Sequence, residues 1–234
     1  GELQLPKDDA KFYKVYTPED KSYEIHSVNF MVKETKNSGE WVELGGFKPG
    51  KVIKTIGEYN KETKSSPKLE FPKEKRFDED VIAQVANFKK TTINLLGEVK
   101  EFITEYDAVV YLMDTLPKYK DKRLYVSGNI EVSMANGKIY RKLVPTYVRE
   151  AKEDEKNKLQ ASVELFYNKN SVDKTRLADE GIVDLFAYVD DYDRPSKSNK
   201  YFPMSVVLNV SGVNLENEKN KARLDHLVKY MTDP

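Results

Sequence analysis

The sequence predicts a mainly β protein with a few helices, a fold of the α+β class. Short segments with alternating apolar residues recur along the chain, and the clearest one runs from Leu124 to Val132. Asn136-Gly137 follows this segment and is typical of a two-residue hairpin turn, because both positions of such a turn require a positive φ. Helical spacing is confined to a few short stretches. We therefore expect strands to build the fold and helices to flank them.

The first half of the chain contains several predicted strands but no motif that assigns a function. Residues 61–76 are charged and contain prolines, as a loop does, and Asp78 is placed to cap a short helix. Residues 104–114 have helical spacing and end before Pro117. Strands are predicted at 23–34, 41–47, 51–59 and 91–99. We place a domain boundary near 104, so that residues 1–104 form a smaller β-rich region, either a second barrel or a decoration.

The second half has a more regular pattern. With Asn136 and Gly137 as the turn, the hairpin register pairs Glu131 with Lys142 and places Gly128 opposite Pro145. Glycine and proline both weaken a regular ladder, so a sharp bend or a bulge is expected there. The remaining elements are a strand at 158–167, a short helix at 171–181, strands at 182–190 and 201–211, and a last helix at 216–231.

The order of these elements is strand, strand, strand, short helix, strand, strand, with a bent first strand. This order resembles the OB-fold, a five-stranded Greek-key barrel. The stretch "KYKDKRLYVSGNIEVSMANGKIYRKLVPTYV" (118–148) is also similar to the first hairpin of phage and bacterial single-stranded-DNA-binding proteins, in its V-S-G-N bend and its N-G-K-I-Y-R-K turn and returning strand. The resemblance implies an OB-fold barrel at 105–234, preceded by the smaller β-rich region at 1–104.

The resemblance also implies a function. Such proteins bind single-stranded DNA without sequence preference in DNA replication or recombination. OB-folds bind oligonucleotides on the face of strands 2 and 3 and on the adjoining loops. Members of this family often end in an acidic tail that recruits replication proteins, whereas this chain stops at "MTDP" without one. The sequence therefore leaves replication proteins open as partners.

The charge of the chain is unevenly distributed, although it sums to zero, with 39 basic and 39 acidic residues. Residues 116–149 contain eight basic and two acidic residues, a net charge of +6. The chain has no cysteine, which excludes disulfides, thiolate nucleophiles and cysteine metal sites. The sequence contains no apolar run long enough to span a bilayer and no signal peptide, so the cytoplasm is the default compartment, that of the host if the gene is a phage gene.

The candidate nucleic-acid-binding residues combine cations with aromatic rings, because single-strand binders pair phosphate contacts with base stacking. They lie on the outer face of the predicted hairpin, on the strand at 158–167 and in the loop at 190–201. The set is Lys120, Lys122, Arg123, Tyr125, Lys138, Tyr140, Lys142, Phe166, Arg194, Lys197, Lys200 and Tyr201. Trp41 and Phe47 are a further option, although core packing is the usual fate of a lone tryptophan.

Several other features of the sequence have simpler explanations. Asp184, Asp190, Asp191 and Asp193 match no EF-hand spacing, so a solvated acidic loop is expected and no metal site. His26 and His226 lie in no catalytic motif, and neither an enzyme nor a cofactor is predicted. The hairpin face is alternatively an ordinary solvated strand. The alternative functions are a phage structural or accessory protein-interaction module and an RNA-binding OB protein. The sequence does not give the oligomeric state.

Overall fold

The computed structural model describes residues 1–19, 23–85, 90–135, 138–193, 198–214 and 216–232. The chain divides into two compact units, and each is described by itself. Unit 1 contains Gly1–Glu131 and Lys142–Gln160, and unit 2 contains Val132–Arg141 and Ala161–Pro234. The division predicted near residue 104 does not coincide with this one, because residues 105–131 belong to the same unit as the N-terminal strands.

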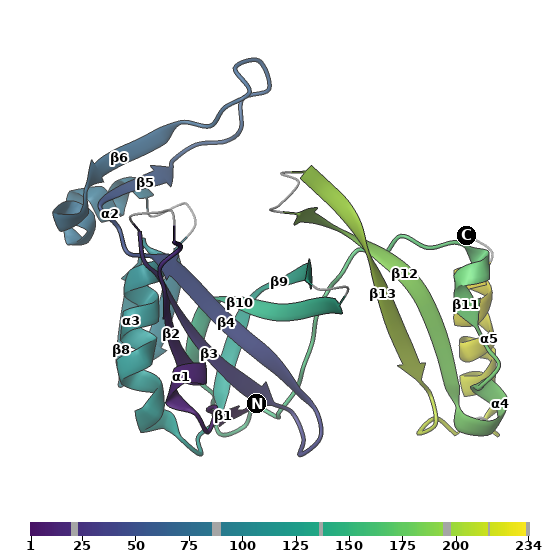
Figure 1. Cartoon of the computed structure of the whole chain (residues 1–234). Coiled ribbons are helices and arrows are strands. Elements are labelled where there is room, and N and C mark those ends of the chain that lie inside the picture. The colour runs from purple at the N-terminus through teal and green to yellow at the C-terminus, as the bar shows by residue number, and fades with distance from the viewer. Residues whose placement is uncertain (20–22, 86–89, 136–137, 194–197, 215, 233–234) are drawn as a thin grey trace. The chain divides into compact units, whose positions relative to one another are not determined.

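Unit 1 is built on one curled, half-barrel sheet (Figure 1). Its strands follow the order β1, β3, β4, β10, β7, β8, with β2 paired to β3 and β9 paired to β10. This confirms the mainly β class. The strand bounds are β1 Glu2–Gln4, β2 Tyr13–Tyr16, β3 Ile25–Lys33, β4 Gly39–Phe47, β7 Thr91–Leu95, β8 Glu98–Phe102, β9 Leu124–Ala135 and β10 Lys138–Glu150. A one-turn helix, α1 (Asp9–Phe12), lies between β1 and β2.

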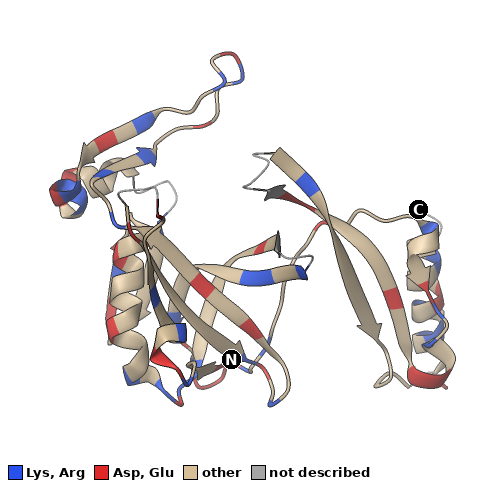
Figure 2. Ribbon diagram, in the orientation of Figure 1, with Lys and Arg blue, Asp and Glu red and all other residues tan. Residues whose placement is uncertain are grey.

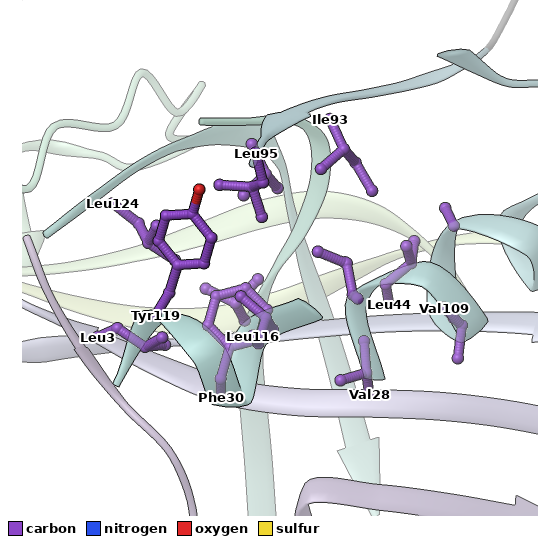
Figure 3. Packing of buried hydrophobic residues seen from close by; sticks show 14 of the residues in the cluster. Leu3, Val28, Phe30, Leu44, Ile93, Leu95, Val109, Leu116, Tyr119 and Leu124 are labelled. Atoms are coloured by element: carbon purple, nitrogen blue, oxygen red, sulfur yellow. The ribbon is translucent and has the colours of Figure 1, made fainter. Parts of the chain in front are cut away.

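The antiparallel pair β3–β4 carries the centre of the unit 1 core. It runs in register from Ile25 with Phe47 to Lys33 with Gly39. Alternate residues on each strand are buried, among them Val28 and Phe30 on β3 and Leu44 on β4. Figure 3 shows these side chains gathered with residues from β7, β9 and the helical segment after residue 104. Period-two alternation in the sequence therefore identifies the inner face of this pair correctly.

Helix α3 (Glu105–Thr115) covers the concave side of this sheet. Its N-cap is Thr104, whose hydroxyl accepts a hydrogen bond from the backbone N–H of Asp107 at 3.1 Å. A 3-10 turn, η2 (Leu116–Tyr119), follows it and contains Pro117, so the predicted helix at 104–114 is confirmed. Gly46 of β4 lies directly against the first turn of α3, where any Cβ would overlap the backbone of Tyr106.

The hairpin β9–β10 has the predicted register in its unit 1 part. Lys142 Nζ lies 4.0 Å from a carboxylate oxygen of Glu131. Gly128 lies against the backbone of Val144 and Pro145, closely enough that a Cβ would overlap it. The turn residues Asn136 and Gly137 lie outside the described residues.

The strand β10 also pairs with strands from the first half of the chain, which the sequence did not predict. It is parallel to β4, with Leu143 beside Val42, and parallel to β7, with Val148 beside Ile93. The hairpin therefore belongs to the N-terminal sheet rather than to a barrel made only of residues 105–234. At one end the edges of this sheet meet, because Leu124 N–H donates to Gly1 C=O at 2.8 Å and Glu2 forms a β-bridge with Arg123.

Between β4 and β7 an arm leaves the sheet (Figure 1). The arm, residues 51–77, consists of β5 (Lys51–Thr55), β6 (Lys68–Pro72), the loop between them and a 3-10 turn, η1 (Lys73–Phe77). It is followed by α2 (Glu79–Val85), close to the helix predicted after Asp78. A separate small core holds the base of the arm; its buried members are Val52, Phe71, Val81, Val85 and Ile103.

Unit 2 contains a three-stranded antiparallel sheet with a helix on one side. The sheet order is β11 (Val172–Asp173), β12 (Ile182–Asp193), β13 (Ser198–Asn209). The helix, α5 (Glu218–Thr232), buries Val228 and Met231, and Met231 packs in one cluster with Leu185 and Ala187. Two short elements precede β12, a 3-10 turn η3 (Lys169–Ser171) and α4 (Leu177–Glu180), and Gly181 ends α4 with φ of 65°.

Two predicted elements of unit 2 differ from the structure. Residues 158–167 form no strand; only Phe166 makes an isolated bridge, to Tyr188. The helix expected at 171–181 is reduced to α4, because Val172 and Asp173 pair with β12 instead. Alternating apolar residues indicate which face of a segment is buried, but not whether a partner strand is available. Among the described helices, none combines the length and apolarity needed to cross a membrane.

Candidate nucleic-acid interface

The outer side of β3 and β4 exposes aromatic side chains. Trp41 is 49% exposed and Phe47 is 60% exposed, and both occupy outward positions on β4, where Val42 and Leu44 point inward. Trp41 pairs across the strands with Met31, and Phe47 pairs with Ile25. Burial in the core, the fate expected for a lone tryptophan, is thus wrong for Trp41. We call this surface the ring face; its residues are Ile25, Met31, Trp41, Phe47 and, from the adjoining strand, Lys142.

The loop before β3 extends the ring face. The ring of Tyr23 lies edge-on to the ring of Phe47, with 5.3 Å between their centroids. Such a T-shaped arrangement is one of the favoured geometries of an aromatic pair. Three aromatic side chains from one loop and one strand are therefore brought onto the same side of the sheet.

Lys142 brings a cation to the ring face. The parallel pairing of Leu143 with Val42 places Lys142 next to Trp41 in register. Its ammonium group lies 2.6 Å from Glu43 and 4.0 Å from Glu131. All three side chains are about one-third exposed, and a surface ion pair of this kind contributes only about 0–1 kcal/mol. The ion pair therefore holds Lys142 only weakly, and Glu43 and Glu131 both stay beside its ammonium group.

A second aromatic group lies on β9 and β10. The predicted site residue Tyr125 is 42% exposed, and its ring packs edge-on against Tyr147, at 6.2 Å between centroids. The guanidinium carbon of Arg149 lies 4.3 Å from the centroid of the Tyr125 ring, a cation–π contact. Arg149 also makes a two-pronged ion pair with Glu155, at 2.5 and 2.8 Å. The side-chain hydrogen bond from Arg149, with a backbone N–H from Lys152, lowers the pKa of Glu155 to about 2.

The cations before β9 have partners of their own. Lys122 lies 3.3 Å from Glu150 and 5.0 Å from the centroid of the Tyr119 ring. Arg123 donates from Nη2 to the carbonyl oxygen of Lys152 at 2.5 Å. Lys120 is exposed. These three predicted residues thus lie on the surface of unit 1, where two of them already hold other parts of the chain.

The other predicted site residues belong to unit 2. Lys138 and Tyr140 are exposed on the first part of β10. Phe166 and Tyr201 are brought together, with their ring centroids 5.3 Å apart. Lys200 pairs in register with Asp191, on the opposite side of β13 from Tyr201. Arg194 and Lys197 lie outside the described residues.

Phe166 and Tyr201 are part of a larger surface on the side of β12–β13 that α5 does not cover. We call it the aromatic face; its five members are 40–61% exposed and are Phe166, Phe186, Tyr188, Tyr201 and Val207. Figure 2 shows few charged positions along these two strands. The charges at outward positions are carboxylates: Asp184, which is paired with Arg176 at 2.8 Å, and Asp190. On the described parts of β12 and β13, no Lys or Arg takes an outward position.

One histidine, His26, is buried on the inner side of β3 and belongs to a polar cluster whose other end, Glu24 and Lys48, reaches the surface. Its ring is hydrogen bonded to the hydroxyl of Tyr13 and lies 3.1 Å from Glu24, which in turn pairs with Lys48 at 2.9 Å. The Lys48 hydrogen bond, followed by that of His26, lowers the pKa of Glu24, while burial raises the pKa of Tyr13. Because both ring nitrogens have partners, this cluster is best described as a structural network.

No metal site is found in the described part of the chain. No group of three or more His, Asp or Glu side chains is arranged to hold an ion among those residues. Of the aspartates considered from the sequence, Asp184 is bound to Arg176 and Asp191 accepts a hydrogen bond from the backbone of Val132 at 2.8 Å.

The residues that sequence reasoning placed wrongly or overlooked are on the ring face. Trp41 and Phe47 were only a further option for stacking, with core packing preferred for the tryptophan, and the sequence did not point to Tyr23 or Met31. A signal was present, because Trp41, Glu43, Gly45 and Phe47 fall on one side of an alternating strand and Val42 and Leu44 on the other. The family models, curated proteins and solved structures with which the chain was compared contain no match to it.

Proposed function

We propose that unit 1 is an OB-type barrel and that it binds single-stranded DNA without sequence preference on its ring face. The order of elements supports the fold. β1 and β2 pair with successive stretches of β3 and together act as one interrupted strand. This composite strand, β3, β4, α3, β9 and β10 then repeat the order strand, strand, strand, helix, strand, strand. The arm, α2 and the hairpin β7–β8 are an insertion before the helix.

Strand pairing gives further support to an OB-type barrel. β1 pairs with β3, β3 with β4, β4 with β10 and β10 with β9, and the start of β9 returns to β1 through the bridge of Glu2 with Arg123. The five strands thus follow one another around a ring. The ring is only weakly closed between β4 and β10, which share a single bridge. A partly open five-stranded barrel has these properties.

The single observation that carries the DNA proposal is the exposure of Trp41 and Phe47 on β4, beside Lys142. In this assignment β3 and β4 are strands 2 and 3, the face that OB-folds use for oligonucleotides, and Tyr23 lies in the loop between strands 1 and 2. Base stacking on an aromatic ring contributes about 1–3 kcal/mol per base. Two or three stacked bases therefore outweigh the loss of surface ion pairs of about 0–1 kcal/mol each. Tyr125 and Lys120 of unit 1 remain proposed contacts outside the ring face.

The direct test is fluorescence anisotropy of a labelled oligothymidine at increasing salt. We expect binding at low salt that weakens as salt rises, since lysines that contact phosphate release counterions. An absence of binding at low salt would defeat the proposal. Competition by an oligouridine of the same length separates DNA from RNA as the preferred strand.

A protein-interaction function is the second candidate, and one observation favours it. The main cations near the proposed surface are each matched by a carboxylate: Lys142 by Glu43, Lys122 by Glu150, and Arg149 by Glu155. This compensation reduces the positive potential that a polyanion would meet. If the oligothymidine does not bind, the same exposed rings are the place to seek a protein partner.

A further inference from the structure

The aromatic face of unit 2 lacks a covering layer. A sheet of a stable domain buries its apolar side against another element, and β12–β13 already has α5 and its neighbours on one side. On the other side, Phe186, Tyr188 and Tyr201 are more than half exposed. Exposed apolar patches of this kind mark interaction surfaces. What covers it must therefore come from outside unit 2.

The charges beside this face select the chemistry of the occupant. Asp190 lies opposite Tyr201 in register, and Glu164 is exposed two residues before Phe166. A polyanion would meet carboxylates here, without a lysine or arginine at an outward position on the described strands. A cationic segment with apolar side chains suits the face better, because complementary charges favour the correct partner and like charges reject the wrong one.

The arm of unit 1 has this chemistry. Residues 51–77 contain eight basic and four acidic residues, a net charge of +4. Two of the cations hold the arm to α3, since Lys54 lies 3.3 Å from Glu105 and Arg76 lies 2.8 Å from Asp107. Five more are exposed and form no ion pair with another described residue: Lys61, Lys64, Lys68, Lys73 and Lys75. Ile53 and Tyr59 of the arm are also about half exposed or more.

We propose that the aromatic face binds the arm of a second copy of this chain. The contact joins two different surfaces and is therefore heterologous. Each copy offers one arm and one aromatic face. Five half-exposed large side chains supply on the order of 500 Å² on one partner, given about 150–250 Å² for a fully buried aromatic. Such an interface lies at the small end of specific ones, so an association in the micromolar range or weaker is expected. The proposal does not rest on nucleic-acid binding.

Sedimentation velocity of the full chain, without nucleic acid, tests the contact. We expect the mean mass to rise with protein concentration up to a few hundred micromolar. The association constant should fall several-fold between 50 and 300 mM NaCl. Phe186→Ser with Tyr188→Ser should weaken association at least tenfold, and so should Lys61→Glu with Lys64→Glu and Lys68→Glu. Leu227→Ser with Tyr230→Ser, exposed apolar residues of α5, is the matched control and should leave association unchanged.

Mixing the two defective variants makes the test specific. Each retains one intact half of a heterologous contact, so the mixture should form a one-to-one dimer although neither variant associates alone. Should the face variant lose its fold by circular dichroism, Asp190→Lys with Glu164→Lys replaces it and is expected to weaken association as well. A wild type that stays monomeric, association that survives the face variant, or association that survives the arm variant would each overturn the proposal.

Discussion

Two sheet surfaces of this protein, one in each unit, expose aromatic side chains, and they differ in the charges beside them. On the ring face of unit 1, Lys142 stands next to Trp41 and shares its charge with Glu43 and Glu131. On the aromatic face of unit 2, Asp190 stands opposite Tyr201, and outward cations are absent from the described strands. Exposed rings alone therefore do not define a ligand. We propose a polyanion for the face that carries Lys142 and a basic segment for the face that carries only carboxylates.

The two surfaces also differ in the way the chain supports them. The ring face lies on strands whose other side is packed against α3 and a core of sixteen buried residues. The aromatic face lies on a hairpin whose other side packs on a smaller core, in which the described buried residues include Val183, Leu185, Ala187, Phe202 and Met231. We expect the surface on the larger core to be the more rigid of the two, because more buried contacts hold its strands in place.

The largest effect is expected from a change at Gly46, because it alters the packing of α3 that supports the ring face and leaves the aromatic face of unit 2 untouched. In Gly46→Ala the new Cβ overlaps the backbone of Tyr106, so α3 must move away from β4, at a cost of about 1–3 kcal/mol or more. Urea unfolding followed by Trp41 fluorescence measures this loss. Gly45→Ala is the control, because its Cβ would have no neighbour closer than 3.8 Å. Equal stability of the two variants would contradict the packing of α3 on β4.

Trp41→Ala is expected to have the next largest effect, on binding rather than on stability. Loss of one stacking ring should lower the affinity for oligothymidine by about 5- to 150-fold, from about 1–3 kcal/mol per base. Phe186→Ala removes an equally exposed ring from unit 2 and should leave the affinity unchanged. Anisotropy titrations at one salt concentration measure both. If Phe186→Ala has the larger effect, the assignment of the two surfaces is reversed.

Lys142→Gln should have a smaller effect that appears mainly in the salt dependence. If Lys142 contacts one phosphate, its removal lowers the slope of log affinity against log salt by about 0.7, the value per phosphate for single strands. Lys229→Gln, on the exposed side of α5, should not change the slope. A slope that is the same in both variants would show that Lys142 stays with Glu43 and Glu131 in the complex.

The smallest effect is expected from the Arg149–Glu155 pair that braces Tyr125. The pKa of Glu155 is lowered to about 2, so its ionised form stabilises the folded state above the ordinary value of 4.5, and this contribution is lost as the pH falls from 4.5 toward 2. Glu155→Gln should therefore be less stable than the wild type at pH 7, and the difference should shrink below pH 4.5. Glu153→Gln, outside the pair, is the control. A difference that does not change with pH would contradict this account.

Local features of the fold were predictable because they depend on neighbouring residues. The alternation along β3, the capped helix before Pro117 and the contact of Glu131 with Lys142 all follow from periodicity, capping and hairpin register. The pairing of Leu143 with Val42 was not predictable, because these residues are about 100 positions apart and alternation identifies a buried face without naming the neighbouring strand. The prediction of a strand at 158–167 was wrong for the same reason. Its residues alternate as in a strand, but only Phe166 pairs with another strand.

The candidate site was predictable only in part. Tyr125, Tyr140, Phe166 and Tyr201 were expected to be exposed, and they are. For Tyr125 and Tyr201 the reason is alternation, because Leu124 and Phe202 beside them are buried. The pairing of cations with distant carboxylates was not predictable, since Glu43 reaches Lys142 only through the parallel contact of β4 with β10. Trp41 was misplaced because a general tendency of tryptophan was preferred to the alternation of its own strand.

The fluorescence of Trp41 tests the central claim most directly, because it is the one tryptophan in the sequence and lies on the ring face. Titration with unlabelled oligothymidine at low salt should quench this fluorescence in a saturable way, since a base stacks on the indole, and added salt should restore it. Unchanged Trp41 emission at oligothymidine concentrations where anisotropy reports saturation would contradict the claim that β3 and β4 form the binding surface.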